Sequence, residues 1–388
     1  MENYNVGEKS DIGNYFEFLE NLNSENQYEF SFLSEKWADF EQWKTVARAK
    51  IFDLLGYFPE STALEPQTLR IVDKGTFFQE DIEFNTARNV RVKGTLLIPC
   101  DNKKTYPAII ALHDHGGFYF FGREKILEGE NEPEILKNFK TEVYYGRSWA
   151  SEIVKRGYIV LCIDAFYFGS RKLDIDAISN EISNRCPFKL DEIDFGTNDY
   201  IFKYNKNCVY LESLLVKHIL VSSATWPGIM FHDDRKCIDY LYTRKEVDKE
   251  KIGCCGLSIG GFRSVHLAAL DPRIKCSVVA GWMTTYNSLL FDRLRDHTYM
   301  IYIPGLTRYL DLPDVMSLTA PNPVLIQQCS QDALFNYDGM LKSCLKIRKV
   351  YERLGYTKNY RYEFYDNKHE FNLKMQEDAF EWFDLWFK

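Results

Sequence analysis

The sequence IGCCGLSIGG at residues 252–261 decides the fold of this chain. A short apolar run leads into a serine flanked by glycines, and residues 262–270 (FRSVHLAAL) continue as a helix. Such a strand-to-helix turn holds the serine in a strained conformation and lifts its hydroxyl above the sheet. Gly256 and Gly260 are required because a Cβ at either position would clash with the neighbouring strand or helix. We therefore predict that Ser258 is a nucleophile at the start of a helix, whose free N–H groups point at the reacting group.

The segments on either side of this turn alternate between buried strands and helices. The runs with strand character are residues 69–73, 81–84, 90–98, 108–112, 158–166, 252–255, 276–279, 324–328 and 360–365. Apolar residues at helical spacing mark residues 35–56, 149–156, 229–243, 259–270, 340–354 and 376–386. Continuous apolar runs such as AIIAL are typical of strands that are buried on both faces. The pattern predicts an α/β fold with a mostly parallel central sheet and helices on both faces.

Two stretches interrupt this alternation. Residues 120–145 are charged and rich in Glu and Lys, and residues 166–210 are rich in Asn, Asp, Lys and Phe. Long irregular connections in a compact domain are usually lids or binding loops. We predict that both are lid-like insertions in a catalytic domain over residues 66–388, which follows an N-terminal helical extension over residues 1–65.

A serine hydroxyl needs a base to remove its proton as it attacks, and histidine is the usual one. The candidates are His113, His115, His218, His232, His266, His297 and His369. His266 lies on the same predicted helix as the serine and is carried away from it, while His218 and His232 lie in or beside helical stretches. His297 precedes an aromatic run and has no evident role. His369 follows the last predicted strand, where such a sheet places a catalytic base, and we predict that it is the base.

The base needs an acid that fixes its tautomer and stabilises the imidazolium. Asp332 follows the strand PVLIQQC and lies between Ser258 and His369 in the sequence. The order serine, aspartate, histidine is that of the α/β-hydrolases. Asp366 and Glu370 are nearer to His369, but neighbours within a loop rarely point at the same ring nitrogen. We predict that Asp332 is the acid.

Acyl transfer also requires hydrogen-bond donors for the oxyanion. One predicted donor is the backbone N–H of Ile259, the residue after the nucleophile. The second is predicted in the loop HDHGG (residues 113–117), where either His115 or Gly116 could donate its amide. A metal site is the alternative interpretation of this loop, but its ligands are too few, and we predict no metal.

Four motifs along the chain resemble those of the α/β-hydrolase superfamily. They are HDHGG (113–117), GLSIGG (256–261), SQDALF (330–335) and NKHEF (367–371). The chain is most similar to the branch that contains dienelactone hydrolases and acetyl xylan esterases, from about residue 85 to its end. The resemblance implies the α/β-hydrolase fold, a Ser258–His369–Asp332 triad and no cofactor. Dienelactone hydrolases have a cysteine where this chain has Ser258, and acetyl xylan esterases have a different oxyanion loop, so HDHGG carries no sugar specificity.

The expected activity is hydrolysis of a small-molecule carboxylic ester through an acyl-enzyme, with a short acyl group on a sugar-like or small natural-product alcohol. The same triad could serve a lactonase, a C–C hydrolase or an acyltransferase. A peptidase of the prolyl-oligopeptidase kind is less expected, because only about 100 residues precede the core of the fold. A binding module without catalysis is also less expected, because such modules usually lose a member of the triad.

Composition narrows the remaining classes. Of the 388 residues, 45% are hydrophobic and 27% are charged, and the net charge of −8 comes without any basic block, so we expect no nucleic-acid partner. The N-terminus has no apolar segment of a signal peptide, which predicts a cytoplasmic protein. The longest apolar run is shorter than the roughly 18 residues of a membrane span, so no membrane association is expected.

The ten cysteines form no CxxC pair and are expected to be free thiols. A homo-oligomer is left open.

The chain is also rich in aromatic residues that could line a pocket. Phe118, Tyr119, Phe120 and Trp282 are candidates for the pocket wall, and core packing explains each of them equally well.

Overall fold

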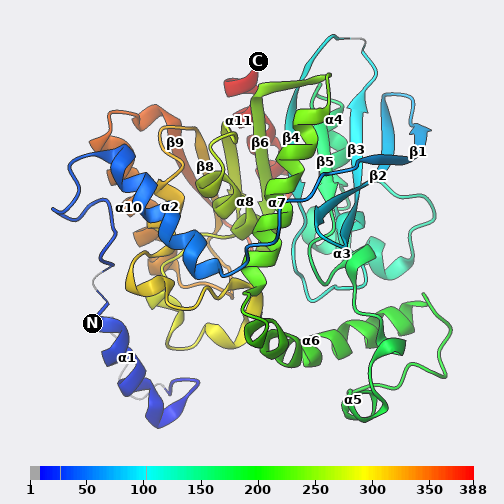
Figure 1. Ribbon diagram of the computed structural model, residues 1–388, viewed down its shortest axis with the longest axis horizontal. Helices are drawn as coiled ribbons and strands as arrows, with labels where there is room; N and C mark the ends of the chain where they lie inside the picture. The colour runs from blue at the N-terminus through cyan, green and yellow to red at the C-terminus, as the bar shows by residue number, and fades with distance from the viewer. Residues whose placement is uncertain (1–8, 27, 102) are drawn as a thin grey trace.

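The computed structural model describes residues 9–26, 28–101 and 103–388, and its centre is a nine-stranded sheet (Figure 1). The strands are β1 (Gln67–Asp73), β2 (Phe77–Ala87), β3 (Val90–Pro99), β4 (Tyr106–Leu112), β5 (Ile159–Ile163), β6 (Val247–Leu257), β7 (Cys276–Ala280), β8 (Val324–Cys329) and β9 (Tyr360–Tyr365). Their order across the sheet is β1-β2-β3-β5-β4-β6-β7-β8-β9.

The first three strands are antiparallel, and β3 is also antiparallel to β5, with Gly94 opposite Ile163. From β5 onward all neighbours are parallel, as in the pairing of Ile110 on β4 with Cys254 on β6. The predicted mostly parallel sheet is therefore confirmed. The carboxyl ends of its parallel strands meet at one edge, which is where open α/β sheets place their sites.

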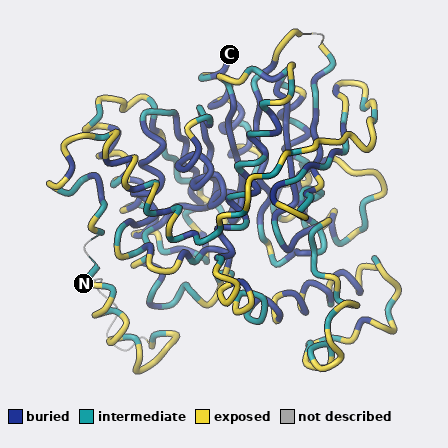
Figure 2. Tube along the Cα trace, in the orientation of Figure 1, coloured by how far each residue is buried: buried dark blue, intermediate teal, exposed yellow. Residues whose placement is uncertain are grey.

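Helices cover both faces of the sheet, as predicted. They are α1 (Phe16–Ser24), α2 (Phe40–Leu55), α3 (Glu134–Tyr144), α4 (Trp149–Val154), α5 (Asn180–Arg185), α6 (Asn198–Val221), α7 (Trp226–Thr243), α8 (Ile259–Leu270), α9 (Leu312–Ser317), α10 (Tyr337–Arg353) and α11 (Leu373–Phe387). Alternate residues of the central strands β4, β5 and β8 enter opposite cores. Ile110 packs in the core that holds α2, α7, α8 and α10, whereas Ile109 packs in the core with α4 and α11. Figure 2 shows the buried strands between these two layers.

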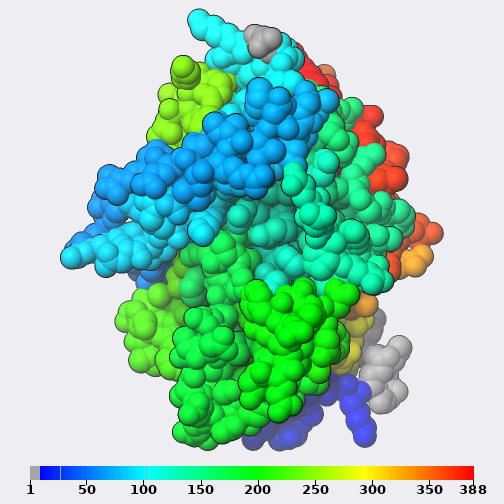
Figure 3. Space-filling model, turned by 90° about the vertical axis from the view of Figure 1, so that its right-hand side faces the viewer, coloured from blue at the N-terminus to red at the C-terminus, as the bar shows by residue number. Residues whose placement is uncertain are grey.

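The two insertions are more regular than the sequence predicts. Helix α3 lies inside residues 120–145, and α5 and the beginning of α6 lie inside residues 166–210. Helix α6 begins where Thr197 Oγ1 accepts a hydrogen bond from the Tyr200 N–H at 3.2 Å. Its buried side mixes apolar residues with Asn205 and Glu212, so the sequence lacks a clean helical period. The second insertion, residues 166–210, and the rest of α6 form the lower, green part of the face in Figure 3.

Helix α2 is shorter than the predicted helix over residues 35–56. Asp39 lies before its first turn and accepts a hydrogen bond from the Gln42 N–H at 2.8 Å, which begins the helix at Phe40. Gly56 ends it in the left-handed conformation, with φ of 63°. Residues 35–39 and Gly56 therefore lie outside the helix.

The N-terminal segment is attached to the main body by more than apolar packing. Arg48 on α2 donates hydrogen bonds to the carbonyl oxygens of Ala269 at 2.7 Å and Leu318 at 3.1 Å. Trp43 on the same helix is fully buried in the larger core. The division of the chain at residue 65 stays a prediction.

The ten cysteines are free thiols, eight of them buried. Within residues 9–26, 28–101 and 103–388, no group of three or more His, Cys, Asp or Glu side chains is arranged to hold a metal ion. In the same part of the chain no single helix is long and apolar enough to cross a membrane, although α6 and α7 together, bent by 81°, pass that test of length and composition.

Candidate active site

Ser258 lies in the tight turn between β6 and α8, as the sequence predicts. Its φ of 58° and ψ of −123° are an unusual conformation for a residue with a side chain. A Cβ on Gly256 would come within 2.5 Å of the backbone of Gly260 and of the Leu112 carbonyl, and one on Gly260 within 2.2 Å of that carbonyl. Both glycines therefore permit the close approach of β4, β6 and α8 that this turn requires.

His369 and Asp332 form a hydrogen-bonded pair across two loops. Asp332 follows β8 and His369 follows β9, and the distance from Asp332 Oδ2 to His369 Nδ1 is 2.5 Å. The other carboxylate oxygen accepts a hydrogen bond from the Leu334 N–H at 2.9 Å, which fixes the carboxylate. With its proton on Nδ1, the ring presents Nε2 as an acceptor. That nitrogen is buried and has no hydrogen-bond partner among the described residues.

A cavity of about 230 Å³ connects these side chains. Its walls include six residues that the sequence singles out, namely Ser258, Ile259, His115, Gly116, Trp282 and His369. Asp332 lies behind His369 rather than in the wall, and its side chain is almost fully buried. The structure therefore brings the predicted nucleophile, base and acid together with both predicted sources of oxyanion donors.

The predicted oxyanion loop, residues 113–117, follows β4 and is called the oxyanion loop below; it contains two glycines in the left-handed region, Gly116 and Gly117, with φ of 56° and 64°. A Cβ on Gly116 would meet the Phe139 ring and the Asp114 carboxylate at 2.6–2.7 Å. The Gly117 N–H is occupied, because it donates to His115 Nδ1 at 2.9 Å. Glycine at position 116 is therefore required both for its φ and for space.

A buried carboxylate on α6 was not predicted and connects three segments of the site. Glu212 Oε1 accepts hydrogen bonds from Tyr119 Oη at 2.7 Å, Thr298 Oγ1 at 2.7 Å and His115 Nε2 at 3.2 Å. Burial by itself would raise the pKa of Glu212, but the hydrogen bonds from His115, Thr298 and Tyr119 hold that pKa below its ordinary value. The carboxylate therefore fixes the His115 ring, whose Nε2 carries the proton because Nδ1 is an acceptor.

Lys125 lies behind the oxyanion loop, with its side chain fully buried. Its Nζ donates to the carbonyl oxygens of Asp114 and His115 and lies 3.5 Å from Asp114 Oδ2. The Tyr144 hydroxyl donates to the other oxygen of that carboxylate. Burial lowers the pKa of Lys125, and the charge of Asp114 opposes this effect. The sequence offered no signal for this residue, because a single lysine in a charged insertion is usually solvated.

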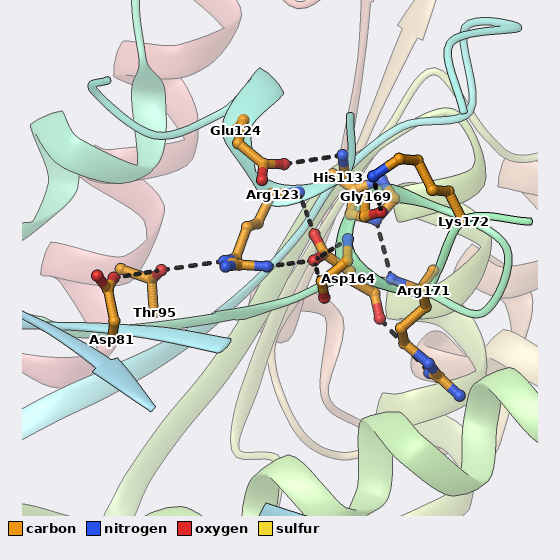
Figure 4. A network of polar contacts seen from close by, with 12 residues as sticks. Asp81, Thr95, His113, Arg123, Glu124, Asp164, Gly169, Arg171 and Lys172 are labelled. Atoms are coloured by element: carbon orange, nitrogen blue, oxygen red, sulfur yellow. Dashed lines mark hydrogen bonds and ion pairs between the residues drawn. The ribbon is translucent and has the colours of Figure 1, made fainter. Parts of the chain in front are cut away.

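A second buried network, shown in Figure 4, holds the segment that carries Lys125. Asp164, the residue after β5, accepts hydrogen bonds from the N–H and the guanidinium of Arg123 and from the N–H of Ser170 at 2.9 Å. The Arg123 guanidinium also donates to Thr95 Oγ1 on β3 at 3.1 Å. Arg123 and Lys125 belong to the same short turn of 3₁₀ helix, so the network fixes this turn against the sheet.

His297 had no predicted role, but it lines the cavity between Asp296 and Thr298, which also line it. Its Nε2–H donates to the Leu334 carbonyl at 3.2 Å. Burial lowers the pKa of His297 to about 4, so the ring is neutral near pH 7. Trp282 packs edge-on to it at 5.6 Å between ring centroids.

Other sequence candidates lie elsewhere. Phe118 stacks on Phe139 and Tyr119 is bonded to Glu212, so these rings serve packing and support behind the cavity. The two rival acids are also occupied: Asp366 accepts from Gln331 Nε2 at 2.7 Å and Glu370 accepts from Tyr145 Oη at 2.9 Å. The three helical histidines have structural contacts. His218 bonds to its own helix, His232 donates to the Thr86 carbonyl, and His266 is buried between aromatic rings.

Comparisons with known proteins support the fold. The model of the Abhydrolase family matches residues 10–380. A Bacillus subtilis (strain 168) protein, YtaP, provisionally assigned as a hydrolase, is 26% identical over 315 residues, which are 81% of this chain and 90% of that protein.

Solved structures with the same fold include two esterases. A provisionally assigned acetyl xylan esterase from Bacteroides fragilis NCTC 9343 has a TM-score of 0.69 at 16% identity, covering 92% of this chain and 84% of that chain. A glucuronoyl esterase from Solibacter usitatus has a TM-score of 0.60 at 13% identity, covering 92% of this chain and 97% of that chain. These likenesses confirm the α/β-hydrolase fold that the sequence motifs predict.

Proposed function

The chain belongs to the Abhydrolase family, and from this premise we propose that it is a serine-dependent carboxylic ester hydrolase that works through an acyl-enzyme. One observation carries the proposal. Ser258, in a strained conformation, and His369, which is paired with Asp332, line one cavity together with residues of two segments that could supply backbone N–H donors. A nucleophile, a base oriented by an acid, and oxyanion donors are the parts that acyl transfer requires.

Each part has one task in the proposed reaction. His369 Nε2 accepts the Ser258 proton as Oγ attacks the ester carbonyl, and the imidazolium is stabilised by Asp332. The tetrahedral oxyanion is held by the Ile259 N–H, which the first turn of a helix leaves without an intrahelical partner, and by the oxyanion loop. His369 then protonates the leaving alcohol. In the second half it activates water, which releases the acid and restores Ser258.

The dimensions of the cavity favour a short acyl group. Its volume of about 230 Å³ is below the range of about 300–1,000 Å³ that is usual for sites of drug-sized ligands. The proposed acyl group is therefore acetyl or of similar size.

The wall formed by residues 296–298 favours an alcohol with hydroxyl groups. The Nε2 proton of His297 is donated to a carbonyl, so its Nδ1 is left as an acceptor beside the carboxylate of Asp296. The Thr298 hydroxyl donates to Glu212 and accepts the Met300 N–H, which leaves it one further acceptor position. No lysine or arginine is among the described residues of the cavity wall. These features, together with the acetyl xylan esterase name of a structural neighbour, support a neutral, sugar-like alcohol.

The proposal is tested with p-nitrophenyl esters from acetate to octanoate. We expect the highest kcat/KM for acetate in the wild type, and a loss of about 10⁴-fold or more in Ser258→Ala. Ser264→Ala is the matched control, because Ser264 is a buried serine on α8 whose hydroxyl donates to the Gly260 carbonyl at 2.9 Å and which is not among the described residues of the cavity wall. Equal activity of Ser258→Ala and wild type would refute the nucleophile. Wild-type products that appear as transferred esters when an alcohol is added would instead identify an acyltransferase.

A further inference from the structure

The oxyanion loop is held from behind at its carbonyl groups. Lys125 Nζ donates to the carbonyl oxygens of both Asp114 and His115, the latter at 3.1 Å. The Asp114 carbonyl oxygen also accepts a hydrogen bond from His113 Nδ1 at 2.8 Å. His113 carries its proton on Nδ1, because its Nε2 accepts the Ala165 N–H. The His115 carbonyl also accepts the Phe118 N–H at 3.1 Å. Lys125 is the one side chain that donates to both carbonyls, which therefore point into the protein.

The orientation of these carbonyls determines where the following amides point. In a trans peptide the C=O and the N–H of one unit point in opposite directions. The Asp114 carbonyl shares its peptide with the His115 N–H, and the His115 carbonyl shares its peptide with the Gly116 N–H. Both N–H groups therefore point away from Lys125, and both residues line the cavity. The next amide, of Gly117, is bonded to the His115 ring.

We propose that Lys125 is a positioning residue of the oxyanion hole, which holds two carbonyls so that the amides of His115 and Gly116 face the substrate oxyanion. The inference rests on the proposed ester hydrolase function and extends it to a side chain that does not touch the substrate. The inference also distinguishes the Gly117 amide, which already donates to the His115 ring, from the amides of His115 and Gly116, which remain as donors for the oxyanion.

The surroundings of Lys125 are built to hold it in this place. The side chain is fully buried, lies over the Phe168 ring at 4.9 Å and is 3.5 Å from the Asp114 carboxylate. Its own segment is fixed through Arg123 and Asp164. A lysine that served solubility alone would not be buried among rings and paired carbonyls.

The first test compares Lys125→Met with Lys140→Met. Lys140 is also a buried lysine that donates to a carbonyl, that of Leu127 at 2.6 Å, but it bonds to no residue of the oxyanion loop. We expect both variants to lose stability. In Lys125→Met, kcat for p-nitrophenyl acetate should fall about 10²-fold with KM changed less than about threefold, because oxyanion donors act in the transition state. The inhibition constant of trifluoroacetone, whose adduct with Ser258 carries an oxyanion, should rise by a similar factor.

Lys140→Met should retain the wild-type kcat within about twofold, because its contacts leave the oxyanion donors in place. If Lys125→Met is stable and keeps the kcat and the trifluoroacetone affinity of Lys140→Met, the proposal is wrong.

A measurement on the wild type covers the case in which Lys125→Met does not fold. In a crystal structure of the trifluoroacetone adduct, the oxyanion should lie within hydrogen-bond distance of the His115 or Gly116 nitrogen as well as that of Ile259. An oxyanion bonded instead to the Gly117 nitrogen, or to Ile259 alone, overturns the role of Lys125. A wild type that neither hydrolyses esters nor forms the adduct refutes the proposed function itself, so the two failures are distinguishable.

Discussion

Both carboxylate oxygens of Asp332 accept a hydrogen bond, Oδ2 from the His369 ring at 2.5 Å and Oδ1 from the Leu334 N–H at 2.9 Å. In Asp332→Asn the amide can place an NH₂ donor against Nδ1, which favours the tautomer with its proton on Nε2. We expect kcat for p-nitrophenyl acetate to fall about 10³–10⁴-fold with little change in stability. Asp366→Asn is the control in the neighbouring loop. Similar losses in the two variants would mean that Asp332 is not the acid.

The residues of the site differ in how far the sequence could predict them. Ser258, Asp332 and His369 each follow a strand of a parallel sheet, and the carboxyl ends of such strands meet at one edge. Lys125 and Glu212 reach the site only because their segments pack there, which no local period in the sequence encodes. The sequence also left open which loop amide would serve the proposed oxyanion hole, because this depends on the carbonyl partners inside the protein.

His266 offers a test of burial at a single residue. Its ring is fully buried, stacks on Phe231 at 4.2 Å, and burial lowers its pKa to about 4. In the unfolded chain histidine titrates near pH 6.5. Below that pH the unfolded state binds a proton that the folded state does not, so this contribution to stability is complete above pH 6.5 and is lost as the pH falls to 4.

Between pH 7.5 and pH 4 the loss from His266 amounts to about 3 kcal/mol. In His266→Phe, which keeps an aromatic ring, the free energy of unfolding should change by about 3 kcal/mol less over this range than in the wild type. Urea unfolding at the two pH values measures the difference, with the exposed His218→Phe as control. An unchanged pH dependence in His266→Phe would show that the ring takes up its proton at the same pH in the folded and unfolded states, which contradicts the lowered pKa.

At the scale of elements, α6 connects the second insertion, residues 166–210, to the candidate site. The sequence indicates an irregular lid, but residues 198–221 form a long helix whose buried side mixes rings with amides and a carboxylate. A buried helix face with this mixed composition does not produce the pattern of apolar residues at helical spacing by which helices are predicted. The helix reaches the site through Glu212, which holds the oxyanion loop through His115 and the cavity wall through Thr298.

Removal of this carboxylate should therefore loosen both segments. In Glu212→Leu the three donors lose their partner, at a cost of about 1–3 kcal/mol for each buried group that stays unpaired. We expect a free energy of unfolding lowered by about 3 kcal/mol or more, a lower kcat/KM, and faster amide hydrogen exchange in residues 113–119 and 296–300. Asp199→Asn, at the exposed start of the same helix, loses only an exposed ion pair with Lys203 and should leave the activity and the exchange unchanged and the free energy of unfolding within about 0.5 kcal/mol. Slow exchange in both segments of Glu212→Leu would show that α6 does not hold them.

At the scale of the whole molecule, the layers follow directly from the sequence pattern. Continuous apolar runs became the buried parallel strands, and helical periods became the covering helices. The antiparallel order of β1 to β3 was not predicted, because the residues of a strand do not by themselves state the direction of the strand beside it. The packing of the N-terminal segment could not be predicted either, because the spacing of apolar residues in α2 does not identify the surface against which this helix packs.

Whether residues before 66 unfold together with the sheet is a question of cooperativity. Trp43 on α2 is fully buried beside Phe32 and donates its indole N–H to the Phe30 carbonyl. Because α2 shares the larger core with α7 and α8, we expect Trp43→Ala to lower the free energy of unfolding of the whole chain by about 3–5 kcal/mol. Coincident transitions by circular dichroism and by esterase activity in guanidinium measure this. Val46→Ala, on the exposed side of α2, should cost less than about 1 kcal/mol. If Trp43→Ala instead shows an early transition that leaves activity and the main transition unchanged, the N-terminal segment is an independent unit and its packing on α8 does not stabilise the site.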